Sequence, residues 1–258
     1  MANAPTPATG TVTACWRYPV KSLQGLSVDR LEIGPSSIEG DRAHGIVDVA
    51  TGKVLSAKRT KQLLDGIADD STITLPDGTS LGLDDPSVDA SLSQWLGRTV
   101  RLVSAPDAGA VSYEMTFDPP NEDAEVYDIP VPEGTLLDLS PVHLVTTATL
   151  AHCEAARPDL DWDLRRFRPN LVLDVDVPPF GEQAWVDHEI TIGGATLSTI
   201  MPMLRCAMPL RAQPGLGKEP AIFQALTDLN EAFPNHLGLA CGVIHPGSIR
   251  VGDPVSVA

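Results

Sequence analysis

The sequence predicts a β-rich α+β protein with a β-barrel-like core, an N-terminal β-barrel or sheet domain, and a few peripheral helices. Two observations predict this class. Short β-branched or alternating segments follow one another between Thr11 and Ala105, with Gly and Pro turn signals between them. Such a succession favours a barrel or a sandwich over alternating β-α units, and few segments repeat apolar residues at helical spacing.

The first part of the chain is expected to hold short strands and one helix. The expected strands are residues 11–18, 26–33, 43–49, 53–58, 71–75 and 80–83, of which the last four form two hairpins. Asp85 then offers an N-cap, and apolar residues recur at helical spacing until Gly97. This pattern predicts a helix with a buried apolar face.

The second part begins with a segment of a different kind, residues 105–134, which is rich in Asp, Glu, Pro and Gly. Long irregular segments of this composition are typical of linkers and of lids over pockets. The expected strands that follow are residues 142–145, 170–175, 189–192, 195–201, 239–244 and 248–251, and the expected helices are residues 146–156 and 218–230. We therefore expect a first domain over 11–105, a linker or lid over 106–134, and a second domain over 135–258.

Length and charge limit the class of the protein and its partners. A chain of 258 residues with 43% hydrophobic residues can build one large or two medium domains. The net charge of −16 comes from 18 basic and 34 acidic residues, so we expect no nucleic acid and no membrane surface as a partner. The N-terminal segment lacks the features of a signal peptide, and no apolar run reaches about 18 residues, which predicts a cytoplasmic protein.

Cys206 is the first candidate for chemistry, because it directly follows Arg205 at the end of an apolar run. A neighbouring cation favours the thiolate, which is the form that acts as a nucleophile or as a soft metal ligand. The residues alone leave both uses open. Cys15, Cys153 and Cys241 lie far apart and fit buried positions, and the six histidines have no metal-ligand spacing.

The basic residues form a second candidate set, since they are scarce in an acidic chain. Lys21 and Ser22 follow one predicted turn, and Arg42 lies in another. The run Arg165–Asn170 holds three arginines directly before a predicted strand and ends in Asn170. Arginine suits bidentate binding of phosphate or carboxylate, so these turns are candidates for an anion site. The alternative is a set of solvated surface charges.

Five motifs in order give the chain a family resemblance. They are Tyr18-Pro19-Val20-Lys21-Ser22, Gly40-Asp41-Arg42, Phe167-Arg168-Pro169-Asn170, Arg205-Cys206 and the closing run Pro246–Val255. With these motifs the chain resembles the MOSC family, as an N-terminal MOSC β-barrel domain followed by a MOSC domain. The resemblance covers nearly the whole chain from residue 11 onward.

The resemblance implies a molybdenum-pterin cofactor and the reduction of N-hydroxylated or N-oxygenated small molecules. It implies that Cys206 is the catalytic residue and the molybdenum ligand. It also implies that the pterin and its phosphate are held by Lys21, Ser22, Arg42, Ser140, Arg168, Asn170, Leu204 and Arg205, with a further backbone contact at Ala240. Pyridoxal phosphate binding is a family-level expectation as well.

Other uses of the same residues stay open. Cys206 carrying a persulfide would make the protein a sulfur carrier or sulfurtransferase, and a third possibility is a module that binds the cofactor without catalysis. Relatives often have a small residue or a cysteine at the position of Met203, and threonines shortly after the ligand cysteine, where this chain has Ala207–Leu210. This difference predicts a more apolar substrate side. Because the chain shows no ferredoxin domain, we expect a separate electron donor: a ferredoxin, a cytochrome b5-like protein or a flavin reductase.

Overall fold

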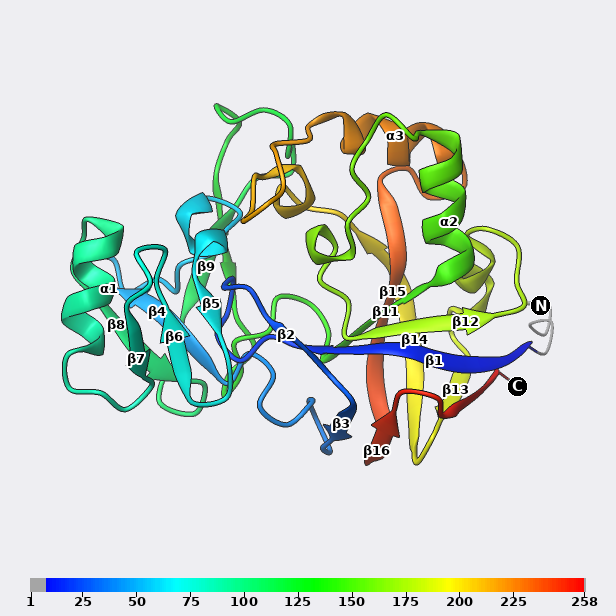
Figure 1. Ribbon diagram of the computed structural model, residues 1–258, viewed down its shortest axis with the longest axis horizontal. Coiled ribbons are helices and arrows are strands. Elements are labelled where there is room, and N and C mark those ends of the chain that lie inside the picture. Colours follow the sequence, from blue (N-terminus) through cyan, green and yellow to red (C-terminus); the bar gives the residue numbers. More distant parts are fainter. Residues whose placement is uncertain (1–7, 258) are drawn as a thin grey trace.

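The computed structural model describes residues 8–257, and its largest element is a closed barrel (Figure 1). The strands follow the order β12-β11-β15-β14-β13-β17-β1, and pairing between β1 and β12 closes the circle. Their bounds are β1 Ala8–Arg17, β11 Val142–Thr146, β12 Leu171–Val175, β13 Glu189–Ile192, β14 Ala195–Leu204, β15 His236–His245 and β17 Pro254–Val257. All pairings in the circle are antiparallel except that of β11 with β12. The predicted β-rich α+β class is confirmed.

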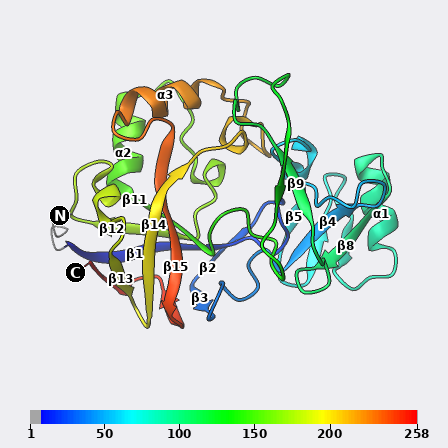
Figure 2. The same ribbon diagram turned by 180° about the vertical axis from the view of Figure 1, so that it is seen from behind.

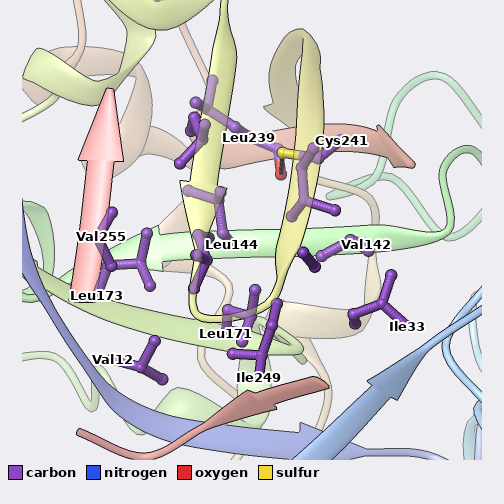
Figure 3. Packing of buried hydrophobic residues seen from close by; sticks show 14 of the residues in the cluster. Val12, Ile33, Val142, Leu144, Leu171, Leu173, Leu239, Cys241, Ile249 and Val255 are labelled. Atoms are coloured by element: carbon purple, nitrogen blue, oxygen red, sulfur yellow. Dashed lines mark hydrogen bonds between the residues drawn. The ribbon is translucent and has the colours of Figure 1, made fainter. Parts of the chain in front are cut away.

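Alternating apolar residues of these strands fill the interior of the barrel (Figure 3). Val12, Leu144, Leu171 and Leu239 all point into this core and are buried. Cys241 lies among them, as the sequence predicted for a small buried residue. The side chains that alternate with these core residues along the same strands therefore face outward. The rest of the molecule covers part of this outer face.

A smaller lobe lies beside the barrel and is formed by β4 to β10 with α1 (Figure 1). Its strands are β4 His44–Asp48, β5 Ile67–Ala68, β6 Thr72–Thr74, β7 Ser80–Gly82, β8 Val100–Ser104, β9 Ser112–Met115 and β10 Tyr127–Pro130. Helix α1 spans Val88–Leu96 and ends at Gly97, whose φ of 66° suits glycine. The chain between lobe and barrel also contributes β2 Leu26–Val28 and β3 Arg30–Ile33, the latter paired with β16 Gly247–Arg250.

Two helices pack against each other on the outer face of the barrel (Figure 2). Helix α2 spans Thr147–Ala156, and the side chain of Thr146 caps it by accepting a hydrogen bond from the Thr149 amide. Helix α3 spans Ala221–Leu229 and begins three residues later than expected, after Pro220. Short 3₁₀ turns complete the fold: η1 Lys61–Asp65, η2 Leu164–Arg166, η3 Gly181–Trp185 and η4 Met208–Leu210.

One local prediction was wrong. Residues 53–58 do not form a strand: Val54 makes a single bridge to Val47, and β4 takes β8 as its sheet partner instead. Within the segment 105–134, expected to be a linker or lid, β9 and β10 pair with each other. The pairing of β4 with β8 joins segments that are distant along the chain. The pairing of β9 with β10 has no turn signal that would predict its register.

The first strand, β1, lies between β17 and β12, so both ends of the described chain belong to the barrel. The domain boundaries expected near residues 105 and 134 stay a prediction. Among residues 8–257, no helix is long and apolar enough to cross a membrane.

Candidate functional site

Cys206 lies at the seam between the barrel and the smaller lobe. It follows the end of β14 and packs against the core of the smaller lobe, next to Met208. Its side chain is partly exposed, whereas Cys15, Cys153 and Cys241 are buried. Burial raises the pKa of the Cys15 thiol to about 11 and that of the Cys153 thiol to about 12. Cys206 is therefore the accessible cysteine of this chain.

Ala240 lies in β15, the strand that pairs with β14 ahead of Cys206. Leu239 and Cys241 face the barrel core, so Ala240 between them faces outward. Ala240 pairs with His143 on one side and Met201 on the other, and it is fully buried. Ala240 has no exposed surface in this structure, so the backbone contact that the resemblance implies stays a prediction.

Two arginines from different turns lie over one aromatic ring. The guanidinium carbons of Arg42 and Arg168 are 4.6 and 4.1 Å from the ring centroid of Tyr18. The Tyr18 hydroxyl donates to the Pro169 carbonyl at 3.1 Å, and Arg168 Nη1 donates to the Leu23 carbonyl at 2.7 Å. These cation–π contacts and hydrogen bonds hold two charges in fixed positions.

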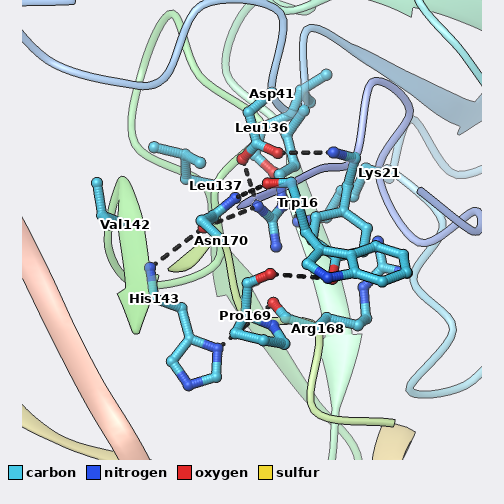
Figure 4. A network of polar contacts seen from close by, with 12 residues as sticks. Trp16, Lys21, Asp41, Leu136, Leu137, Val142, His143, Arg168, Pro169 and Asn170 are labelled. Carbon is cyan, nitrogen blue, oxygen red and sulfur yellow. Dashed lines mark hydrogen bonds and ion pairs between the residues drawn. The ribbon is translucent and has the colours of Figure 1, made fainter. Parts of the chain in front are cut away.

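Asn170 ties this pair of arginines to the barrel (Figure 4). Its Oδ1 accepts hydrogen bonds from the His143 amide at 3.2 Å and from Arg42 Nη1 at 3.3 Å. Its Nδ2 donates to the Trp16 carbonyl at 3.2 Å. Arg42 also forms an ion pair with Asp41. Asn170 is buried, so its role in this structure is to fix Arg42 against β1 and β11.

Arg205 is held by backbone and by a neutral histidine. Its Nη2 donates to the Phe167 carbonyl at 2.7 Å, and its Nη1 lies 3.3 Å from His143 Nε2. Burial, and then the charge of Arg205, hold the pKa of His143 well below its usual range. His143 therefore accepts from Arg205 through Nε2 and donates through Nδ1 to the Arg168 carbonyl at 3.4 Å. Arg205 Nε is buried and has no described partner.

Two lysines meet at one carboxylate. Asp138 accepts hydrogen bonds from the ammonium groups of Lys21 and Lys58, the latter at 2.9 Å. Lys21 Nζ also donates to the Leu136 carbonyl at 2.8 Å (Figure 4). The two ammonium nitrogens lie 4.9 and 3.9 Å from the ring centroid of Tyr113.

The other predicted positions have different surroundings. Ser22, at a φ of 70°, accepts a hydrogen bond at Oγ from the Ala57 amide at 3.0 Å. Ser140 Oγ donates to the Val142 carbonyl at 3.1 Å, and Leu204 is 52% exposed at the end of β14. Hydrogen bonds thus link the predicted residues Arg42, Asn170, Arg168 and Arg205 through Tyr18 and His143, and place Ser140 and Leu204 outside this network.

The three arginines before Asn170 do not act together. Arg165 pairs with Asp163 at the surface. Arg166 is buried and donates to the carbonyls of Pro209, Arg211 and Gly217, at 3.2, 3.2 and 2.9 Å. It fixes the segment that follows Cys206, and only Arg168 reaches the candidate site.

The sequence reasoning missed Lys58, Tyr113, Asp138 and His143. Lys58 was placed in a strand, and the scarcity of cations in this acidic chain is the signal that could have singled it out.

The charge balance at this seam tests whether an anionic cofactor fits. The basic groups are Lys21, Lys58, Arg42, Arg168 and Arg205, and the carboxylates that pair with them among residues 8–257 are Asp41 and Asp138. Arg168 and Arg205 have no carboxylate partner within the described chain. Buried positive charge without a counter-ion is costly, and a phosphate-bearing ligand would compensate it. The donor set, with one accessible thiol, also suits a soft metal.

One consequence is a pH-dependent affinity for anions. Burial lowers the pKa of Lys21 to about 8, against the opposing pull of Asp138. Above that pH the native lysine loses its charge, so affinity of the cofactor-free protein for inorganic sulfate should fall by up to about tenfold per pH unit. The unfolded chain still binds that proton up to about pH 10.4, so the free energy of unfolding should rise with pH over the same window.

Sulfate is the probe because its own charge is constant between pH 7 and 9. Affinities are to be measured by calorimetry at constant ionic strength, with Lys21→Arg as the control that should flatten the profile. A wild-type affinity that is unchanged from pH 7 to pH 9 would contradict this prediction.

The chain is similar to known proteins over most of its length. The family model of the MOSC N-terminal beta barrel domain matches residues 9–99, and that of the MOSC domain matches residues 133–256. Mitochondrial amidoxime-reducing component 1 of Homo sapiens is 27% identical, over 95% of this chain and 82% of that protein. Mitochondrial amidoxime reducing component 2 of Bos taurus is 27% identical over the same shares.

A solved structure, YUAD protein from Bacillus subtilis, aligns over 98% of this chain and 97% of that one. It has a TM-score of 0.45 and 11% identity. None of these names mentions pyridoxal phosphate, and that expectation stays a prediction.

Proposed function

Since the chain belongs to the MOSC family, with a MOSC N-terminal beta barrel domain followed by a MOSC domain, we propose that it binds a molybdenum-pterin cofactor and acts as an oxidoreductase. The observation that carries this proposal is the surplus of buried positive charge beside the one accessible cysteine. An anionic, phosphate-bearing cofactor with a soft metal uses both features. The similarity to amidoxime-reducing components also supports the proposal of an oxidoreductase.

The residues of the site divide into a ligand and its anchors. Cys206 would supply a thiolate to the metal. Arg42 and Arg168, fixed over the Tyr18 ring, are placed to bind phosphate oxygens, and Lys21 adds a third charge. When bound, the cofactor supplies two-electron removal of oxygen from the substrate.

Arg205 orients the bound group through its guanidinium, since its position is set by the Phe167 carbonyl and by His143. Because His143 is neutral, the positive charge of Arg205 stays available to attract an anionic ligand.

We propose N-hydroxylated small molecules as the substrate class, by analogy with the amidoxime-reducing relatives. Leu204 and Met201 are exposed at 52% and 42% near the end of β14 and would give the substrate side an apolar character. A separate protein would deliver the electrons.

A persulfide carrier is the main alternative. Such a carrier needs an activated thiol and one nearby cation. It has no use for the buried Lys21 and Arg168 together with the half-buried Arg42, so the charge balance favours the cofactor.

The test is to prepare the protein in a host that makes the cofactor, determine molybdenum and pterin, and assay reduction of benzamidoxime with a chemical reductant. We expect both components in equal amounts and a turnover that depends on them. Protein that holds neither, and that carries a persulfide mass on Cys206, would reject the oxidoreductase in favour of the carrier.

A further inference from the structure

Lys58 is a buried cation that the family resemblance did not assign to the site. Its side chain is 6% exposed, and it lies in a turn of the smaller lobe. Its backbone carbonyl accepts a hydrogen bond from Arg211 Nη2 at 3.1 Å, and Arg211 belongs to the segment that follows Cys206. The backbone of Lys58 is therefore fixed against the same part of the chain that carries the accessible thiol.

The ammonium group of Lys58 has spare donors. It donates to Asp138 Oδ2 at 2.9 Å and lies 3.9 Å from the centroid of the Tyr113 ring. An ammonium group has three N–H donors, so at least one of them has no acceptor among residues 8–257. By contrast, Lys21 uses two donors on Asp138 and the Leu136 carbonyl.

The local charge is also unbalanced. Lys21 and Lys58 share one carboxylate, that of Asp138, whose side chain is 37% exposed. Although burial opposes the charge of Lys58, Asp138 and then Cys206 raise the pKa of Lys58 above its usual range. Lys58 therefore stays cationic at neutral pH, close enough to Cys206 to interact with a negative charge there.

We propose that Lys58 is a binding residue of this site, and that its ammonium group, held in position by Asp138 and Tyr113, directly contacts an oxyanion of the phosphate or molybdate class. This inference rests on the proposed function, because it takes the cofactor as the source of the oxyanion. The phosphate of the pterin and an oxygen-rich metal group beside Cys206 are the two sources with this chemistry.

The test compares four variants with the wild type, all in their cofactor-free form. Lys58→Met removes the charge and leaves Asp138 paired with Lys21, so the fold should persist. Lys58→Arg keeps the charge. The matched control is Lys53→Met, because Lys53 is a lysine of the same lobe that pairs with Glu114 and Asp128 away from the site. Circular dichroism and thermal unfolding check the fold, and Lys58→Gln gives a second removal of charge.

Inorganic phosphate and molybdate are titrated separately at constant ionic strength, with binding followed by calorimetry. We expect Lys58→Met and Lys58→Gln to weaken binding of at least one probe by about tenfold or more. The affinity of Lys58→Arg for both probes should stay within about threefold of that of the wild type. The affinity of Lys53→Met should equal that of the wild type. A loss confined to phosphate assigns the pterin phosphate as the source, and a loss confined to molybdate assigns the metal oxyanion.

Pterin content provides a readout that is independent of catalysis. Protein from a cofactor-producing host should contain less pterin as Lys58→Met than as wild type or Lys53→Met. If Lys58→Met binds both probes and pterin as wild type does, the role of Lys58 is overturned while the proposed function stands. If wild-type protein binds neither probe nor pterin, the proposed function fails together with this inference.

Discussion

Cys206→Ala is expected to abolish stable retention of molybdenum while leaving the fold intact. Loss of a partner that merely supports a metal ligand typically costs about 10- to 100-fold in metal affinity, so loss of the ligand itself should cost at least about 100-fold. The side chain is partly exposed, and its truncation should change the free energy of unfolding by no more than about 1 kcal/mol. The measurements are molybdenum per protein by mass spectrometry and thermal unfolding.

Cys153→Ala is the matched control, because this thiol lies on α2 and is buried in the hydrophobic cluster that joins α2 and α3. It should lower the free energy of unfolding by about 1 kcal/mol and leave molybdenum content unchanged. Equal molybdenum in wild type and Cys206→Ala would remove Cys206 as the ligand.

Arg205→Met is expected to lower both cofactor retention and stability. The substitution leaves the buried Phe167 carbonyl without its donor at 2.7 Å, which should cost about 1–3 kcal/mol of the free energy of unfolding. It also removes a buried charge that the proposed cofactor would use, so pterin content should fall about tenfold or more after gel filtration.

Arg165→Met separates these effects from a general loss of positive charge. Arg165 is a partly exposed arginine paired with Asp163, and its replacement should change stability by about 0.5 kcal/mol and leave pterin content at the wild-type level. If Arg205→Met loses stability and keeps its pterin, Arg205 has only a structural role.

Local signals predicted much of the fold. Hairpins such as β6–β7 and β13–β14 were predicted because their turns and apolar alternation lie within a few residues. The closure of the barrel by β1 and β12 was beyond reach, since Thr13 meets Val172 across 159 positions of sequence. No local pattern specifies a pairing of that range.

The site was predictable in part for a related reason. Arg42 and Arg168 were predicted as candidates for an anion site because they are cations in turns, and the structure places both over the Tyr18 ring. Lys58 was missed because the sequence pattern placed it in a strand, and the structure forms a turn there instead. Arg166 lies in the same run of arginines as Arg168, but it belongs to the η2 turn and donates to the segment that follows Cys206. The sequence motifs therefore identified basic residues of the site, but tertiary packing determines which basic residues lie close together.

The most direct test of the central claim is X-ray absorption at the molybdenum edge of the purified protein, compared between wild type and Cys206→Ser. Thiolate ligation by Cys206 predicts that the metal of the wild type has a sulfur neighbour that the variant lacks, in whatever fraction of the variant retains molybdenum. An identical sulfur shell in the two proteins would contradict the assignment of Cys206 as the molybdenum ligand.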